Sequence, residues 1–170
     1  MMATTYTLIA SNTLSSSAAS VTFSAIPNTF TDLVLKISNR VSTATLDSNA
    51  TITFNGITTN THSITYLYGN GASAASGRFS NFSSIIAAYA TQGTSSTSNT
   101  FTNWEVYIPS YTASQNKALS IFSALENNAT TAYLNTGAAL WRNTAAISSI
   151  TITDNFVSGS SFFLYGIKNS

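Results

Sequence analysis

The sequence predicts an all-β protein: an antiparallel, jelly-roll-like β-sandwich of about nine or ten strands, formed as a single domain from residues 1–170. Three observations predict this fold. Thr, Val, Ile, Phe and Tyr, which favour the pleated surface of a sheet, are abundant. Apolar and polar residues alternate with a period of two along most of the chain. Turn sequences such as Asn55-Gly56 and Gly69-Asn70-Gly71 separate the alternating runs.

In each expected strand every second side chain is apolar, which turns one face of the strand toward a core. Alternation of this kind spans residues 5–10, 21–26, 33–38, 51–55, 64–68, 104–108, 119–125, 134–140, 150–152 and 162–164. If the alternation of residues 33–38 continues to residue 40, Lys36 and Arg40 lie together on an outer face. Trp104 shares a face with Val106 and Ile108, so we expect its indole in the core.

The segments between these runs are mostly polar. Residues 91–99 and 109–116 are expected to be long connections, and the small, polar residues 72–77 a mobile loop tip. Residues 82–89 fit a strand and a short helix equally, because they lack the charge pairs and the terminal glycine of a typical surface helix.

Charge is scarce, and this excludes several classes of function. Charged residues make up 6% of the chain, against about 25% in an average globular protein. The net charge is +1, and cysteine is absent. Such a chain lacks the clustered cations that bind nucleic acid, and it lacks the thiolates of zinc, iron–sulfur and cysteine-nucleophile sites. We expect no enzyme activity, no cofactor, no metal and no nucleic-acid partner.

The few titratable residues form no recognisable catalytic or metal-binding motif. His62, the one histidine, is accompanied by no Gly-x-Ser-x-Gly sequence that would mark a nucleophilic serine. The acids are too dispersed for a calcium loop or a convincing glycosidase pair, and capping or turn roles are favoured. The acids considered for these two kinds of site are Asp32, Asp47 and Asp154 for calcium, and Glu105 and Glu126 for glycoside hydrolysis.

We expect a soluble protein without a membrane partner. Residues 1–6 have neither the basic region nor the apolar stretch of a signal peptide. The longest apolar run, residues 85–90, is far shorter than the roughly 20 residues of a membrane span.

The expected surface is neutral rather than charged. A β-sandwich usually protects its edge strands with Lys or Pro, and this chain has two prolines and few lysines. Faces rich in Ser, Thr and Asn can pack against another protein without desolvating charge. The composition therefore favours a surface largely covered by other chains, and the alternative is a monomer with an unusually neutral surface.

Segments along nearly the whole chain have a sequence pattern that is similar to that of one group of proteins. They are residues 6–11, 14–23, 26–27, 31–35, 107–111, 141–142, 145–150 and 156–170, the last ending in Phe-Leu-Tyr-Gly-Ile-Lys-Asn-Ser. In these segments the chain resembles β-rich virion structural proteins of tailed phages from marine and cyanobacterial settings, which look like head decoration or cement proteins. Residues 42–50 and 70–100 carry little of the resemblance, so we expect variable outward loops there.

The resemblance implies a protein on the exterior of the virion head, assembled in the host cytoplasm. Copies forming a homo-oligomer, such as a trimer, would bind the major capsid protein and stabilise the shell. The alternative is a fibre or receptor-binding module whose loops recognise glycans on the host surface. An aromatic cluster exposed at one end of the sandwich would favour that alternative.

Five residues are candidates for the partner interface. Arg40, Arg78 and Arg142 could each make a bidentate contact with a carboxylate of a partner. Tyr111 lies in a proline-bent corner that could form an exposed contact loop. Trp141 fits an interface and a core position equally, because it precedes Arg142 at the end of an expected strand.

Overall fold

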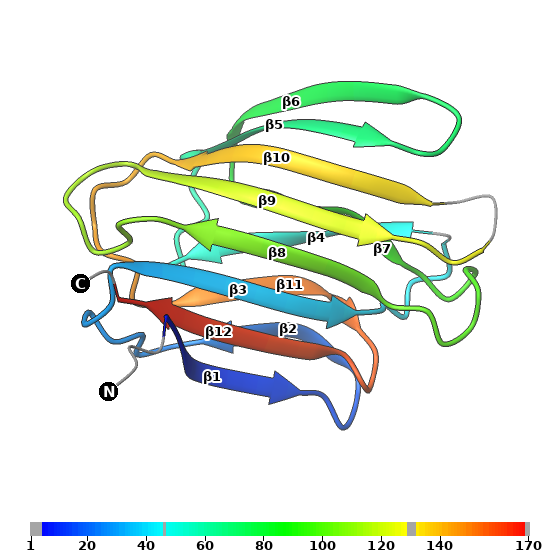
Figure 1. Ribbon diagram of the computed structural model, residues 1–170, viewed down its shortest axis with the longest axis horizontal. Coiled ribbons are helices and arrows are strands. Elements are labelled where there is room, and N and C mark those ends of the chain that lie inside the picture. The colour runs from blue at the N-terminus through cyan, green and yellow to red at the C-terminus, as the bar shows by residue number, and fades with distance from the viewer. Residues whose placement is uncertain (1–4, 46, 129–131, 169–170) are drawn as a thin grey trace.

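The computed structural model describes residues 5–45, 47–128 and 132–168, and it confirms an all-β sandwich (Figure 1). Within these residues there are twelve strands and no helix. The expected nine or ten strands were therefore too few. The described residues contain no helix that is long and apolar enough to cross a membrane. The strands are β1 (Tyr6–Thr13), β2 (Ala18–Phe23), β3 (Asp32–Asn39), β4 (Asp47–Phe54), β5 (His62–Gly69), β6 (Ala74–Phe82), β7 (Ile85–Gln92), β8 (Thr102–Ile108), β9 (Lys117–Leu125), β10 (Tyr133–Trp141), β11 (Ile150–Phe156) and β12 (Ser161–Ile167).

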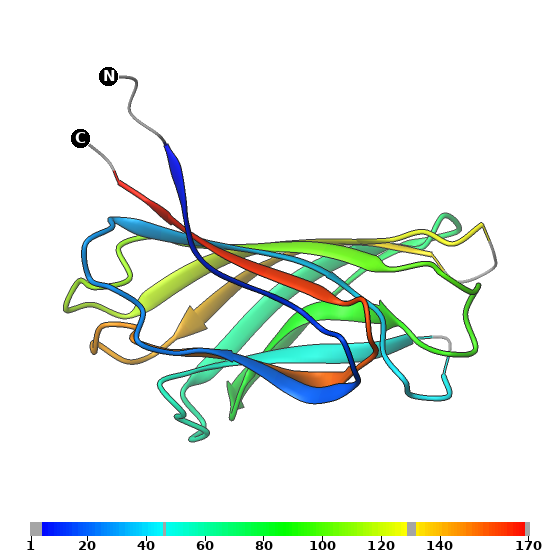
Figure 2. The same cartoon turned by 90° about the horizontal axis from the view of Figure 1, so that it is seen from below.

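Eight of the strands form the jelly roll. Strands β1-β12-β3-β8 lie side by side in one sheet, and β2-β11-β4-β7 form the other, all with antiparallel pairing. Among these eight strands, the chain crosses between the sheets from β1 to β2, β2 to β3, β3 to β4 and β7 to β8, then from β8 to β11 by way of β9 and β10, and from β11 to β12. This is the double Greek-key order of a jelly roll. Figure 2 shows the two sheets as stacked layers.

The remaining four strands are two insertions that widen one sheet. The β5–β6 and β9–β10 pairs add to β8, giving the order β1-β12-β3-β8-β9-β10-β5-β6, whereas the opposite sheet keeps four strands. We call the β5–β6 hairpin the arm, and Figure 1 shows it at the far edge of the wide sheet. No residue of β6 is buried, so neither face of this strand is covered by the smaller sheet.

The core lies between the two sheets, where the inward residues of each strand meet. Trp104 is buried as expected, and its indole Nε1 donates a hydrogen bond to Asn39 Oδ1 at 2.7 Å. Leu35, Ile52 and Phe162 are among the other fully buried side chains. The alternation seen in the sequence thus identifies the buried side of most strands. It fails in β1 and β10, where the apolar residues Leu8 and Leu134 lie on the exposed side.

One open alternative was settled and two local expectations were wrong. Residues 82–89, which fitted strand and helix equally, form the end of β6 and much of β7. The supposed loop tip at 72–77 lies mostly in β6, because Asn70 Oδ1 closes a tight turn by accepting hydrogen bonds from the backbone N–H of Ala72 and Ser73, at 3.1 and 2.8 Å. The region 70–100, expected to be outward loops, therefore contains two strands and the buried side chains of Thr91 and Gln92.

Candidate functional site

Two of the residues considered for an interface are fully buried. Trp141 takes the core position that was one of its two alternatives, and Tyr111 does not form an exposed contact loop. The Trp141 indole packs against Phe54, with ring centroids 5.2 Å apart, and has no exposed surface. Tyr111 is also fully buried, and its hydroxyl donates to the backbone oxygen of Pro27. Both side chains fill the end of the sandwich, where a large ring excludes water from the core.

Arg40 was also assigned wrongly, since it does not lie on an outer face beside Lys36. The regular strand ends at Asn39, and Arg40 forms an isolated bridge with Gln92 in the other layer. Its side chain is 8% exposed and donates hydrogen bonds to three backbone oxygens: Ser96 at 3.0 Å, Thr97 at 2.8 Å and Thr100 at 3.0 Å. The guanidinium therefore organises the loop between β7 and β8.

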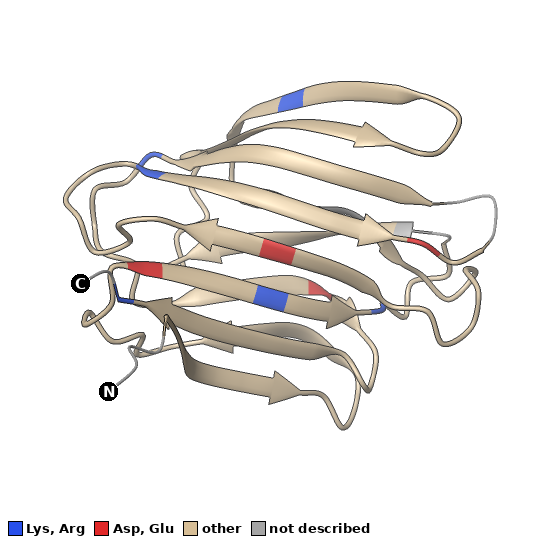
Figure 3. Ribbon diagram, viewed as in Figure 1, with Lys and Arg blue, Asp and Glu red and all other residues tan. Residues whose placement is uncertain are grey.

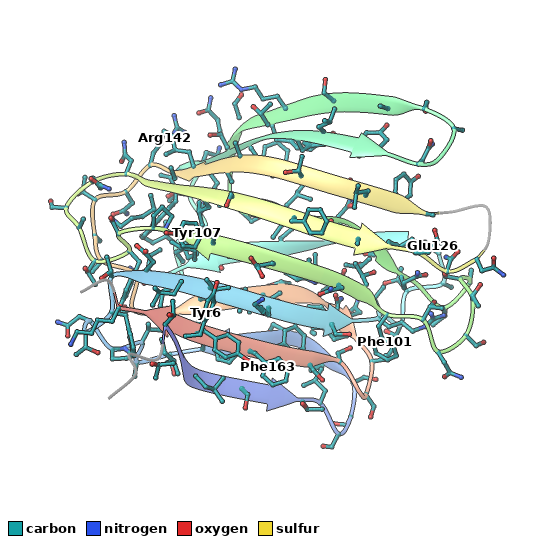
Figure 4. The ribbon with its side chains drawn as sticks, in the orientation of Figure 1. Tyr6, Phe101, Tyr107, Glu126, Arg142 and Phe163 are labelled. Atoms are coloured by element: carbon teal, nitrogen blue, oxygen red, sulfur yellow. The ribbon has the colours of Figure 1, made fainter. Side chains whose placement is uncertain are left out.

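The other two arginines are exposed. Arg142 donates hydrogen bonds to the backbone oxygen of Asn60 and to Asn81 Oδ1, both at 2.7 Å, which fastens the base of the arm to the loop before it (Figure 4). Arg78 lies in the middle of β6, opposite Thr65, on the outer side of the arm. Of the five candidates, these two remain available to a partner.

The titratable groups are dispersed. His62 is buried among aromatic rings, with Nδ1 3.3 Å from the backbone oxygen of Phe82, and this burial lowers its pKa from 6.5. Asp32 accepts hydrogen bonds from the Tyr107 hydroxyl at 2.9 Å and the Ser110 N–H at 2.8 Å, and the same bond raises the pKa of Tyr107. Asp32 thus stabilises the turn after β8, in agreement with the turn or capping role that the sequence favoured for this residue.

The remaining acids have local partners too. Asp154 accepts from Ser48 Oγ and Thr91 Oγ1, at 3.3 and 3.2 Å, and Glu126 Oε1 accepts from the backbone N–H groups that follow it. The side chain of Asp47 lies outside the described residues. Among the side chains that are described, no three His, Cys, Asp or Glu residues gather where a metal ion could sit.

Among the described residues, five of the six large apolar side chains that are exposed lie on the outer side of the eight-stranded sheet, which we call the broad face. Its exposed apolar residues come from strands far apart in the sequence. They are Tyr6 (45% exposed), Leu8 (51%), Leu67 (52%), Phe122 (49%) and Leu134 (56%). Strand register aligns Phe122, Thr136 and Leu67 in one row across β9, β10 and β5. Figure 4 views this face, with Tyr6 and Phe163 on its lower strands.

An ion pair occupies the middle of the broad face. Lys36 Nζ lies 2.8 Å from Glu105 Oε2, on adjacent strands, and both side chains are about half exposed. The Glu105 carboxylate raises the pKa of Lys36, and the ammonium also lies 5.8 Å from the centre of the Tyr6 ring. The two charges cancel, so the centre of the face is neutral. Figure 3 shows how sparsely other charges lie around it.

The opposite outer surface, on the four-stranded sheet, presents hydroxyl groups instead. Thr22, Thr151 and Thr53 stand in one row across β2, β11 and β4, and the Thr22 and Thr151 hydroxyls are 3.0 Å apart. Ser20, Thr153 and Thr51 form the next row along the same strands. The two outer surfaces therefore differ sharply in chemistry, and we call this one the hydroxyl face.

The third notable surface is a chain of five aromatic rings on the inner side of the arm and the adjoining end of β10. Successive ring centroids are 4.9 Å apart from Phe82 to Phe79, 5.7 Å from Phe79 to Tyr66, 6.3 Å from Tyr66 to Tyr68 and 5.8 Å from Tyr68 to Tyr133. We call it the aromatic row. All five side chains are partly or largely exposed.

Neither the broad face nor the aromatic row was identified from the sequence. The alternation in β9 places Leu119 and Ile121 inward, so it also places Phe122 outward, and a large apolar residue at that position was an available signal. The aromatic row joins residues of β5, β6 and β10 that only strand pairing brings together.

Comparison of the chain with protein-family models, curated proteins and solved structures gave no match. What the molecule does must therefore be inferred from its jelly-roll fold and from its exposed surfaces: the broad face, the hydroxyl face and the aromatic row.

Proposed function

We propose that this protein is a head decoration protein of a tailed phage. Copies of it, associated as a homo-oligomer such as a trimer, bind the outer surface of the assembled shell and bridge neighbouring subunits of the major capsid protein. The observation that supports this proposal is the broad face: large apolar side chains exposed on a wide sheet whose one central ion pair is already neutralised internally.

The chemistry of the broad face suits contact with another folded protein. Exposed apolar residues such as Leu67, Phe122 and Leu134 release water when a partner covers them, which favours association. The Lys36–Glu105 pair brings no net charge that a partner would have to compensate. Because screening acts on charges, shell binding through this face changes little with ionic strength.

Multivalency would make such contacts strong. A single face of this kind gives a modest affinity, but linked copies bind adjacent shell subunits with a high effective concentration. The shell would then gain lateral cross-links that oppose the outward pressure of packaged DNA. The hydroxyl face, which lacks exposed large apolar residues among the described side chains, would remain turned to solvent.

Binding of the purified protein to shells stripped of decoration tests the proposal. The variant Phe122→Asp adds a net negative charge opposite Glu105 at the centre of the broad face and should lower the bound fraction at least tenfold. Thr151→Asp, on the hydroxyl face, is the matched control and should bind as the unmodified protein does. Equal binding of all three proteins, or localisation of the protein only at the tail tip of intact particles, would contradict the proposal.

A further inference from the structure

We infer that the aromatic row is a binding site for a neutral, linear oligosaccharide that lies along the open inner side of the arm. The site is separate from the broad face and uses a different side of the wide sheet. It therefore goes beyond shell binding, and the two activities can be tested on separate variants.

The row is accessible because the arm extends past the smaller sheet. Strand β7, the edge of that sheet, packs against β9, β10 and β5, but β6 has no buried residue. Phe82 is 40% exposed at the base of the arm, and Phe79, Tyr66, Tyr68 and Tyr133 are partly exposed along it. Tyr66 and Phe79 pack against the core with part of their surface, and the opposite layer leaves the rest uncovered.

The rings are held in an order that suits a chain-like ligand. The plane of Tyr66 is tilted by 19° from that of Phe79 and by 23° from that of Tyr68, so three consecutive rings are nearly parallel. Tyr66 leans across the neighbouring strand over Gly77, where a methyl group would overlap its hydroxyl oxygen. The absence of a side chain at Gly77 thus lets the ring lie over β6.

The chemistry of the row favours a sugar. The C–H groups on one face of a pyranose ring pack against the electron-rich face of an aromatic ring, and a row of rings can hold consecutive sugars. Strands β5 and β6 carry one charged residue, Arg78, and it lies on the outer side of the arm. Arg142, at the base of the arm, is already hydrogen-bonded to Asn60 and Asn81, so a single-stranded nucleic acid would find no cation along the other rings to pair with its phosphates.

A peptide fits the site less well. Protein partners usually insert an anchoring side chain into a pocket. Where the arm meets β7, Ile64, Tyr66, Ile86 and Ala87 line an apolar hollow of about 10 Å³, roughly the space of one water molecule. Beside Tyr66 a ligand must therefore lie on top of the rings rather than enter between the layers.

Saturation-transfer NMR and calorimetry with the full chain test the site. The probes are neutral linear hexasaccharides of glucose, mannose, galactose and N-acetylglucosamine. We expect at least one of them to bind, and Tyr68→Ala or Phe79→Ala to weaken its binding about tenfold, the size of one lost aromatic contact. Tyr68→Phe keeps the ring and should retain most of the affinity.

The controls separate the site from the fold and from the broad face. Leu67→Ala, on the opposite side of the same strand, should bind the sugar normally, and circular dichroism should give the same spectrum for every variant. Failure of all four sugars to bind, equal loss in Leu67→Ala, or preferential binding of oligothymidylate or of an apolar peptide would overturn the inference. Shell binding by Tyr68→Ala should remain unchanged, so failure of one proposal does not imply failure of the other.

Discussion

The imidazole of His62 is stacked against the indole of Trp141, with ring centroids 6.4 Å apart and planes 15° apart. Phe54 packs on both rings, and the exposed Arg142 follows directly in the chain. Trp141 also pairs in register with Lys117, whose buried Nζ donates to the backbone oxygens of Ala113 at 2.7 Å and Gln115 at 2.5 Å. The base of the arm is therefore built on the aromatic cluster of His62, Trp141 and Phe54. Lys117 and Arg142 lie beside this cluster, so a positive charge on the buried His62 would be unfavourable.

We predict that acid destabilises the protein through His62. Burial lowers the pKa of His62 in the folded state, and Arg142 lowers it further, so the unfolded chain binds a proton that the folded chain does not. The free energy of unfolding should therefore fall as the pH drops below about 6.5, and be fully recovered above it. Urea unfolding between neutral pH and about pH 5, where most carboxylates stay ionised, measures this. His62→Phe should give a flat profile over that range, and an equally steep one would rule His62 out.

Arg40 should matter for stability and not for partner binding. Arg40→Met removes the donors that satisfy the backbone oxygens of Ser96, Thr97 and Thr100, and should lower the free energy of unfolding by about 3 kcal/mol. Arg78→Met is the matched control, because Arg78 is exposed on β6. This variant should change the free energy of unfolding by about 0.5 kcal/mol at most. Denaturant unfolding of both variants measures the difference, and similar values for the two would contradict it.

Gly93 should tolerate no side chain. A methyl group at this position would overlap the backbone oxygen of Thr45, which also accepts a hydrogen bond from the Ser95 N–H at 3.1 Å. Gly93→Ala should therefore lower the free energy of unfolding by about 2 kcal/mol or more. At Gly69 a methyl group would meet only the backbone oxygen of Ser73, at 3.9 Å, and Gly69→Ala should leave the melting temperature unchanged or slightly raised. If Gly93→Ala left the free energy of unfolding unchanged, the segments around Gly93 and Thr45 would have to be able to move apart at little cost.

The ion pair on the broad face should contribute little to folding. Lys36 and Glu105 are both about half exposed, and exposed pairs are worth about 1 kcal/mol or less. Lys36→Met should lower the free energy of unfolding by less than that amount, and molar salt should have a similarly small effect on the unmodified protein. Thermal melts at low and high salt measure both effects. A loss of several kcal/mol would mean that the pair stabilises the sheet far more than its exposure indicates.

Local pattern determined much of the fold. The alternation around Leu35, Ile52 and Trp104 identifies strands and their buried sides because side chains of a strand point alternately to its two faces. The sandwich class follows, since strands with one apolar face must bury it against another layer. The pattern could not decide between strand and helix at residues 82–89, because a short apolar run has no clear period.

Only the tertiary structure decided which outward positions stay exposed and which end residues are buried. Arg40 and Tyr111 follow the ends of strands, where chain direction rather than alternation determines burial, and both turned inward. Trp141 ends β10 on the same side as Asn135 and Ala139, and only the packing of the two sheets decided that this side, and not that of Leu134, faces the core. Alternation places Phe122 on the outer side of the wide sheet and Tyr68 on its inner side, yet Tyr68 stays partly exposed because two inserted hairpins extend this sheet beyond its partner. That extension depends on pairing between strands distant in the chain, and such pairing leaves no local signal.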